Sequence, residues 1–365
     1  LYIFPIKKNR IFIFSYKGTQ YSCNPKHISE YLTHNYPNKF QIVWAFKKKK
    51  KFKFLKANHI KVVSYFSLAR LYYQVTAKVC INNIGSYAWL PLRKKQLHLN
   101  TWHGGGAYKR CALGEVNNSN LIKKSLRISA KETNCFISSC ETFTSKALIN
   151  DFDYFGKVLN VGLPRNDCFF DSEYILTAKN ELRNLYNIKD EIVILYAPTW
   201  RYDKYNDTIN PNVIIKALES KYDKKVKFLY RSHHLGSDII HFEFNESIIN
   251  VTSYHDMQKL LCLADILITD YSSCIWDFCL MDKPVYLFAP DALEYQKERG
   301  FHLNYFEYGF EVAKDTKELC ENILNDTLED ALERSKKHKQ LLGSYEKGDA
   351  TKQTVKYIID WIDGK

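Results

Sequence analysis

The chain contains the stretch ADILITDYSSCIWDF at residues 264–278. Its first part is a short apolar run that ends at Asp270, and two serines then open a predicted helix. A buried strand that leads directly into a helix is the unit of parallel α/β sheets, because parallel strands are joined by crossover connections. The stretch therefore predicts an α/β fold.

Similar apolar runs, separated by helical stretches, recur along the rest of the chain. They cover residues 10–15, 40–46, 60–64, 79–82, 96–102, 135–138 and 157–161, and then 192–197, 226–230, 248–251, 266–269 and 284–288. Pro and Gly interrupt the pattern at residues 162–167, which places a boundary there. We predict two doubly wound, Rossmann-like domains, residues 1–165 and 166–365, with the carboxyl ends of both sheets at one cleft.

Composition narrows the class of protein. A length of 365 residues suits two domains, and 45% apolar residues argues against disorder. The net charge of +13 predicts nucleotides, polyanions or anionic lipid as partners. Ten cysteines without a repeated C-x-x-C pattern indicate free thiols and a cytoplasmic protein.

No run reaches the roughly 18 to 20 apolar residues of a membrane span, so we expect any membrane contact to be peripheral. Because the chain opens at Leu1 rather than Met, we expect part of a longer protein.

A histidine followed by three glycines comes directly after one predicted strand, in the sequence TWHGGGAYKR at residues 101–110. We interpret His103 as a general base, because its pKa suits proton transfer near neutral pH. Gly104 and Gly105 allow the backbone to approach a ligand, and Lys109 and Arg110 offer positive charge to phosphate. The alternative is a flexible loop with a chance histidine.

Two further motifs follow strands of the second half. In YAPTWR, residues 196–201, Thr199 can donate a hydroxyl hydrogen bond and Arg201 can bind an anion; alternatively the proline turns the chain and the tryptophan packs. In YRSHH, residues 230–234, Arg231 and His233 share one strand face and could hold an anionic group. We predict no metal there, because adjacent histidines diverge on an extended chain; a buried structural His is the other alternative.

The stretch at 264–278 supplies a fourth motif. Asp270, Ser272 and Ser273 lie where a helix begins, and free amides at a helix start favour an anion such as a diphosphate. Simple capping of the helix by Asp270 or Ser272 is the alternative, and it is compatible with phosphate binding.

Together these motifs resemble the CDP-glycerol glycerophosphotransferase family, which makes teichoic acids and related capsule polymers. The likeness includes YSCNPK at residues 21–26 and GLPRND at residues 162–167. The resemblance implies a GT-B architecture and transfer of a polyol phosphate, from CDP-glycerol or CDP-ribitol, to a lipid-linked or polysaccharide acceptor with release of CMP. It implies His103 as the base that activates the acceptor hydroxyl, and Arg231, His233, Ser272 and Ser273 around the donor phosphates.

Three departures from the family pattern stand out. Three glycines replace the usual Gly-Thr-Pro after His103, and His234 replaces the usual proline. A Gly-Pro pair is missing from residues 300–312. From the first two departures we expect differences on the acceptor side, and the third bears on which polyol the donor carries. Basic groups near the diphosphate make a tightly bound metal unnecessary, and a loosely bound Mg²⁺ stays open.

Two basic stretches with apolar residues, at 47–54 and 121–131, could rest on the anionic inner face of the cell membrane. A solvated face is the alternative for each.

A GT-B glycosyltransferase that uses a nucleotide sugar is the alternative function. A nucleic-acid-binding protein is disfavoured, because the charge is dispersed and no RNA-binding signature is present. The choice between glycerol and ribitol, the number of units added and the oligomeric state stay open.

Overall fold

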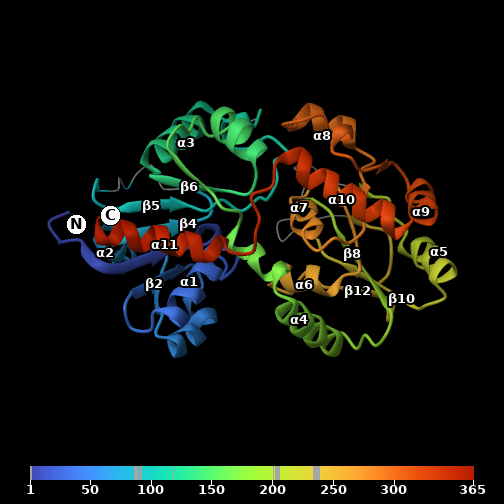
Figure 1. The fold of residues 1–365 in the computed structure, drawn as a ribbon, viewed down its shortest axis with the longest axis horizontal. Coiled ribbons are helices and arrows are strands. Elements are labelled where there is room, and N and C mark those ends of the chain that lie inside the picture. Colours follow the sequence, from blue (N-terminus) through green and yellow to red (C-terminus); the bar gives the residue numbers. More distant parts are fainter. Residues whose placement is uncertain are drawn as a thin grey trace. The chain divides into compact units, whose positions relative to one another are not determined.

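The computed structural model describes residues 2–85, 90, 93–116, 118–199, 201, 206–232 and 239–365 (Figure 1). Contacts divide the chain into two compact units, each with its own parallel sheet. Unit 1 comprises Leu1–Gly105, Cys111–Asp167 and Ser344–Lys365, and unit 2 comprises Gly106–Arg110 and Cys168–Gly343. The predicted α/β class, with two Rossmann-like sheets, is confirmed.

The sheet of unit 1 has the order β3-β2-β1-β4-β5-β6-β7. Its strands are β1 (Lys7–Ile13), β2 (Gln41–Phe46), β3 (Lys61–Ser64), β4 (Ala77–Asn82), β5 (Leu97–Asn100), β6 (Cys135–Ser138) and β7 (Lys157–Asn160). Its α-helices are α1 (Cys23–Asn35), α2 (Leu68–Thr76), α3 (Asn120–Glu132) and α11 (Ala350–Asp363). The strand order reverses between β1 and β4, which is the topological switch point where such sheets bind ligands.

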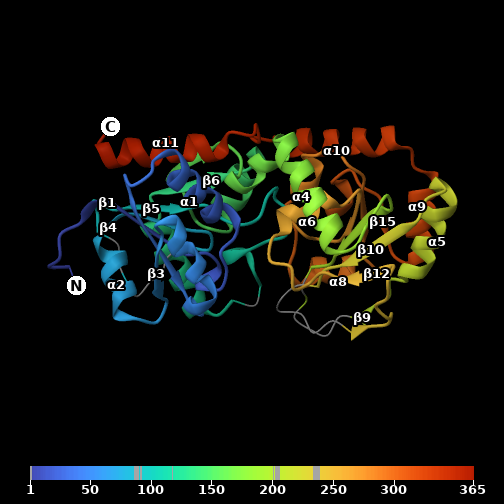
Figure 2. The same cartoon turned by 90° about the horizontal axis from the view of Figure 1, so that it is seen from below.

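Both faces of this sheet are covered, because successive side chains of a strand point to opposite sides. Ile11 and Ile13 pack in a core with residues of α1 and α11, whereas Phe12 and Phe14 pack in a second core against Tyr73 of α2. Figure 2 shows α1 and α11 on one side of the sheet and α2 on the other. Continuous apolar strands such as β2 follow from this double burial.

Helix α11 corrects the predicted domain boundary. The predicted second domain, residues 166–365, includes residues 344–365, but these residues belong to unit 1 (Figure 1). The apolar positions Val355, Ile358 and Ile362 lie on one helical face and are buried in the core of the first sheet. Sequence order places α11 after unit 2, and only this packing reveals its partner.

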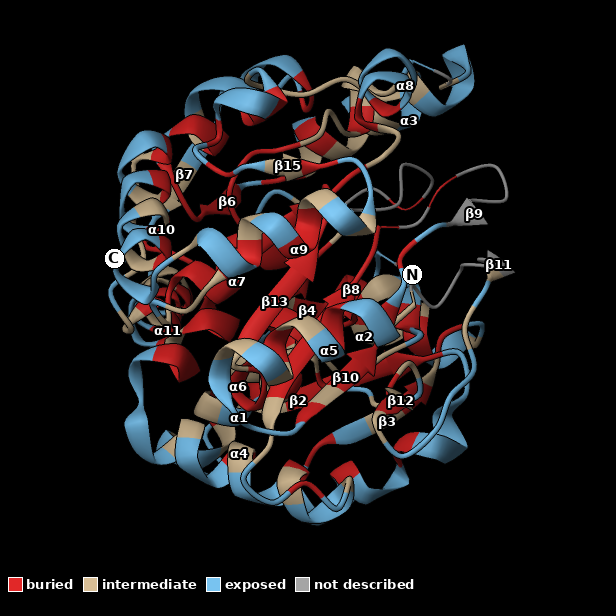
Figure 3. Cartoon of the chain, turned by 90° about the vertical axis from the view of Figure 1, so that its right-hand side faces the viewer, coloured by how far each residue is buried: buried red, intermediate tan, exposed pale blue. Residues whose placement is uncertain are grey.

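The sheet of unit 2 has the order β12-β10-β8-β13-β14-β15, with the same reversal at β8 and β13. Its strands are β8 (Ile192–Ala197), β10 (Val226–Tyr230), β12 (Ile248–Asn250), β13 (Ile266–Thr269), β14 (Val285–Phe288) and β15 (Val312–Ala313), and β9 (Asn206–Asp207) pairs separately with β11 (Ile239–Ile240). Its α-helices are α4 (Ser172–Leu185), α5 (Pro211–Tyr222), α6 (Met257–Leu263), α7 (Cys274–Cys279), α8 (Ala292–Glu298), α9 (Thr316–Asn325) and α10 (Leu328–Leu342). Figure 3 shows buried strands beneath helices with exposed outer sides. Strand β15 was not predicted, because two residues give no periodicity.

Two composition-based expectations can be compared with the structure. All ten cysteines are unpaired thiols, and every one except Cys111 is buried. Within the described residues, no helix has both the length and the apolar character needed to span a bilayer.

Candidate functional site

His103 follows the carboxyl end of β5 in unit 1. The register pairs Asn82 of β4 with Asn100 of β5, so the segments after both strands begin at the same level. Nδ1 of His103 lies 2.8 Å from the carbonyl oxygen of Asn83, the residue that follows β4. The sheet topology therefore brings the predicted base to the switch point of unit 1.

The hydrogen bond to Asn83 fixes the proton on the His103 ring. A carbonyl oxygen can only accept, so Nδ1 must donate, and the basic lone pair of the neutral imidazole is on Nε2. The ring of Tyr16 lies edge-on at 5.5 Å and the ring of Trp102 at 4.2 Å from that of His103. This arrangement suits a general base that accepts a proton at Nε2.

The chain leaves unit 1 and enters unit 2 within the glycines that follow His103. Gly104 and Gly105 belong to unit 1, whereas Gly106–Arg110, which we call the strap, packs with unit 2. The strap is held by main-chain hydrogen bonds: the amide of Arg110 donates to Gly300, and Lys109 forms a bridge with Phe301. The predicted phosphate loop is therefore divided between two units, and the phosphate-binding roles of Lys109 and Arg110 stay predictions.

A buried histidine anchors the strap inside unit 2. Nδ1 of His338 lies 2.8 Å from the carbonyl oxygen of Tyr308, so Nε2 accepts the hydroxyl hydrogen of Tyr108 at 2.6 Å. Burial lowers the pKa of His338 to about 4. His98 of β5 is also fully buried, and burial likewise lowers its pKa to about 4. Both rings are therefore neutral at pH 7.

Stability is expected to fall as the pH drops from about 6.5 to about 4. In this window an unfolded histidine binds a proton and the buried one does not, so protonation favours unfolding, by about 3 kcal/mol per residue at the lower limit. Hydrogen exchange of the strap at pH 7 and 4.5 measures the effect in unit 2. A His338→Gln variant should lose most of this pH dependence; an unchanged slope would contradict the assignment.

In unit 2, the register places the motifs after β8 and β13 together. Ala197 pairs with Thr269, and the segments that follow them meet: the amide of Thr199 donates to both carboxylate oxygens of Asp270 at 2.9 Å. The Arg201 guanidinium donates to the same carboxylate. The structure thus joins three of the predicted donor-binding residues in one network.

Arg201 is bound on both sides by carboxylates. Its Nε and NH2 donate to Asp291 at 2.9 and 3.0 Å, and its guanidinium carbon lies 5.0 Å from the centre of the Tyr271 ring. Although burial alone would lower it, Asp270 and Asp291 raise the pKa of Arg201 well above its usual range. Arg201 is 9% exposed and Asp270 1% exposed, so this geometry favours a positioning role over direct contact with a donor.

Among the described residues, the hydroxyl of Thr199 is the polar group of this network for which no partner is found. Its Oγ is buried and has no hydrogen-bond partner within the part of the chain that the structure describes. Ser272 Oγ accepts the amide hydrogen of Cys274 at 3.4 Å, and Ser273 directly precedes α7 without capping it. Ser272 therefore matches the capping alternative, while Asp270 contacts Thr199, Arg201 and its own chain neighbour instead.

Arg231 lies just beyond β10. Its NH1 donates to the carbonyl oxygen of Tyr254 at 3.0 Å, and its side chain is partly exposed. His233 and His234, like Trp200, lie outside the described residues. The pairing of Arg231 with His233 therefore stays a prediction.

The family follows from comparison with known proteins. The sequence model of the CDP-glycerol:poly(glycerophosphate) glycerophosphotransferase family matches residues 1–360. The chain belongs to this family.

Individual glycerophosphotransferase relatives are similar over most of their length. The chain is 28% identical over 391 aligned residues to a teichoic acid poly(glycerol phosphate) polymerase of Bacillus spizizenii, covering 98% of this chain and 93% of the relative. It is 31% identical over 315 residues to a teichoic acid glycerol-phosphate transferase of Staphylococcus aureus, covering 82% and 78%. A variant of the wall teichoic acid polymerase TagF soaked with CDPG has the same GT-B-like fold, with 26% identity, a TM-score of 0.85 and coverage of 98% and 90%.

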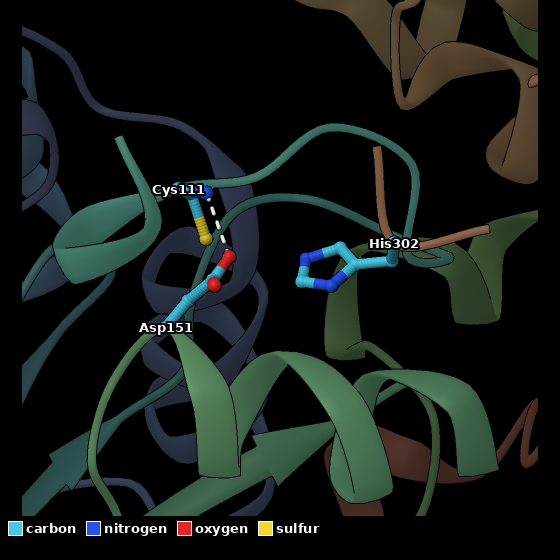
Figure 4. Close-up of side chains that lie close together, drawn as sticks. All are labelled: Cys111, Asp151 and His302. Atoms are coloured by element: carbon cyan, nitrogen blue, oxygen red, sulfur yellow. Dashed lines mark hydrogen bonds between the residues drawn. The ribbon is translucent and has the colours of Figure 1, made fainter. Parts of the chain in front are cut away.

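Sequence reasoning missed several residues of this glycerophosphotransferase site. Asp291 follows β14, so the rule that site residues lie after strand carboxyl ends could have found it. Asn83 contributes its main-chain oxygen, which no side-chain motif signals. The amide of Cys111 donates to the Asp151 carboxylate at 2.8 Å, where the chain re-enters unit 1 (Figure 4). His302, also labelled there, belongs to unit 2, so the three side chains define no metal site within either unit.

Proposed function

We propose that this protein transfers a polyol phosphate from a CDP-activated donor, CDP-glycerol or CDP-ribitol, to a hydroxyl of a teichoic acid or capsule polymer. Family membership over residues 1–360 supports the reaction class. The observation that carries the mechanism is the Nδ1 contact of His103 with Asn83, which leaves Nε2 as the basic nitrogen.

In the proposed reaction, an acceptor hydroxyl attacks the phosphorus that bears the polyol. The new bond joins the acceptor oxygen to this phosphorus, the bond to the bridging oxygen of the diphosphate breaks, and CMP leaves. Nε2 of His103 takes the hydroxyl proton. Asn83 contacts His103 through its carbonyl oxygen, and its buried Nδ2 has no hydrogen-bond partner among the described residues, which supports a polar acceptor on this side.

The donor is proposed to bind at the switch point of unit 2. The buried Thr199 hydroxyl, the serines at 272 and 273, and Arg231 supply hydrogen bonds and positive charge. Such contacts stabilise the charge that accumulates on the leaving phosphate. Asp270 and Arg201 hold the Thr199 segment in place. Mg²⁺ is proposed to be dispensable for binding and to act, where present, as a loosely held counter-ion of the diphosphate.

The function is tested by CMP release from CDP-glycerol and CDP-ribitol, with and without a membrane or polymer acceptor. Release that depends on the acceptor supports the proposal and identifies the polyol. If neither donor releases CMP and a nucleotide sugar is turned over instead, the glycosyltransferase alternative would replace the proposal. Adding a chelator to the same assay tests the expectation that no metal is required.

We further propose that α3 rests on the inner face of the cell membrane. Only Ala130 of this helix is buried, while Leu121 is 81% and Ile122 48% exposed beside Lys123 and Lys124. Exposed apolar residues that are followed directly by lysines suit an anionic lipid surface. The other basic stretch, residues 47–54, is less suitable. Of its two phenylalanines, Phe52 is buried in the core and only Phe54 is exposed.

Removal of charge from α3 is expected to weaken lipid binding. Each basic residue near an anionic surface contributes about 1 kcal/mol, so Lys123→Gln with Lys124→Gln should reduce partitioning about 30-fold. Sedimentation with vesicles of equimolar phosphatidylcholine and phosphatidylglycerol measures this. Lys336→Gln with Lys337→Gln in α10 is the matched control, since both lysines are exposed and lie in unit 2. Equal losses in both pairs would contradict a specific role of α3.

A further inference from the structure

The main chain on either side of His103 is held by two side chains from distant parts of unit 1. Nδ2 of Asn24 donates to the carbonyl oxygens of Thr101 and Trp102, both at 3.0 Å. The Arg165 guanidinium donates to the carbonyl oxygen of His103. The amide of Arg165 in turn donates to Oδ1 of Asn24 at 3.1 Å, so the two residues also hold one another.

These contacts are buried and support an unusual backbone. Asn24 is 0% and Arg165 4% exposed, so water does not compete for the hydrogen bonds. Trp102 has φ of 50°, a left-handed conformation that a bulky residue rarely adopts without support. The loop would relax if the hydrogen bonds to its carbonyl oxygens were lost.

Arg165 is itself fixed by the segment that leads into α11. Glu346 accepts from the amide of Leu163 and from Nδ2 of Asn166, both at 3.0 Å. Asp167 accepts from the amides of Ala350 and Thr351 at the start of α11, at 2.9 and 2.7 Å. The residues on both sides of Arg165 are therefore held by α11 and by the segment before it, and the chain between them carries Arg165 to the His103 loop.

We propose that Asn24 and Arg165 are positioning residues for His103. They hold the loop so that the imidazole stays against the Asn83 carbonyl, with Nε2 as the proton acceptor. They act through the loop and not on the substrate. The proposal rests on the proposed function of His103, and it assigns a role to two motifs, residues 21–26 and 162–167, that the proposed reaction otherwise leaves unused.

The test compares Asn24→Ala with a matched control, Gln96→Ala. Gln96 is 1% exposed, and its side-chain amide makes hydrogen bonds of the same three kinds as that of Asn24. Its Nε2 donates to the carbonyl oxygens of Gln74 and Ala77 at 2.8 and 2.7 Å, and its Oε1 accepts from the Arg93 amide at 2.9 Å. It lies at the amino end of β5, whereas His103 follows the carboxyl end. Both substitutions remove equivalent buried hydrogen bonds, and only one touches the His103 loop.

We expect Asn24→Ala to lower kcat about 10- to 100-fold with the KM for CDP-glycerol unchanged, because misplacing a catalytic group affects the chemical step. Nitrogen-15 NMR of labelled histidines, assigned with a His103→Gln variant, should show the Nδ1–H tautomer in the wild type and in Gln96→Ala. In Asn24→Ala it should show a mixture of both tautomers.

Two results would overturn the proposal: an unchanged tautomer and kcat in Asn24→Ala, or an equal loss of kcat in Gln96→Ala. If Asn24→Ala does not fold, Arg165→Lys provides the same comparison, since it keeps the charge but not the guanidinium that reaches the His103 carbonyl. The NMR measurement needs no substrate. A wild type that releases no CMP would therefore refute the proposed function while the tautomer still tests the positioning.

Discussion

Replacing His103 with alanine is expected to lower acceptor-dependent CMP release about 10²- to 10⁴-fold, the usual effect of losing a general base. Without Nε2 the acceptor hydroxyl keeps its proton while it attacks phosphorus. The fold should survive, because Asn24 and Arg165 bind the main chain of the loop and not the imidazole. Steady-state CMP release at saturating CDP-glycerol measures the loss.

His34→Ala is the matched control for this experiment. His34 lies in the last turn of α1, is exposed and belongs to the same unit, so its loss should leave turnover unchanged. Binding of CDP-glycerol to His103→Ala, measured by calorimetry, should also be unchanged, since the donor is proposed to bind unit 2. A His103→Ala enzyme that keeps more than about a tenth of wild-type turnover would exclude this residue as the base.

Arg201→Met is expected to destabilise unit 2 by about 3 to 5 kcal/mol, because it leaves the buried Asp270 carboxylate without its counter-charge. The second carboxylate, Asp291, loses its charged partner as well: despite its burial, the hydrogen bond and charge of Arg201 lower the pKa of Asp291 in the folded protein. Hydrogen exchange of β8 and β13 reports the local free energy of unfolding directly. This readout is needed because a protein of two units need not unfold in one step.

Lys317→Met is the matched control, because it removes an exposed ion pair whereas Arg201→Met removes a buried one. Lys317 pairs with Glu321 at 3.7 Å on the surface of α9, with side chains 87% and 56% exposed. Solvent screens such a pair, so its loss should cost less than about 1 kcal/mol. Similar effects of the two substitutions would show that the Arg201 network does not stabilise the fold. An equal change in the exchange of β1 and β4 would show that the effect is not local to unit 2.

The strands could be predicted because parallel strands covered on both faces read as continuous apolar runs. β2 and β13 are examples, and each run predicted in the two halves corresponds to a strand. The rule that ligands bind after strand ends also led to His103, Thr199 and Asp270. These predictions depend on neighbours in sequence, which a single chain displays.

What could not be predicted depends on contacts between distant residues. The ring of His103 is oriented by the main chain of Asn83, and Arg201 is bound by Asp291 from another strand end. The expectation that Arg201 is available to an anion assumed that it had no carboxylate nearby. The assignment of α11 failed for the same reason, since its amphipathic face does not say which sheet it covers.

The placement of α11 has a consequence for synthesis on the ribosome. Multidomain proteins usually complete their domains in the order of translation. Here the first sheet is made early, but the face of Ile28 and Leu32 that α11 helps to cover must wait until the whole of unit 2 has been translated. Unit 2 is therefore expected to be the first to finish folding in the nascent protein, while unit 1 still exposes apolar surface that a chaperone would have to shield.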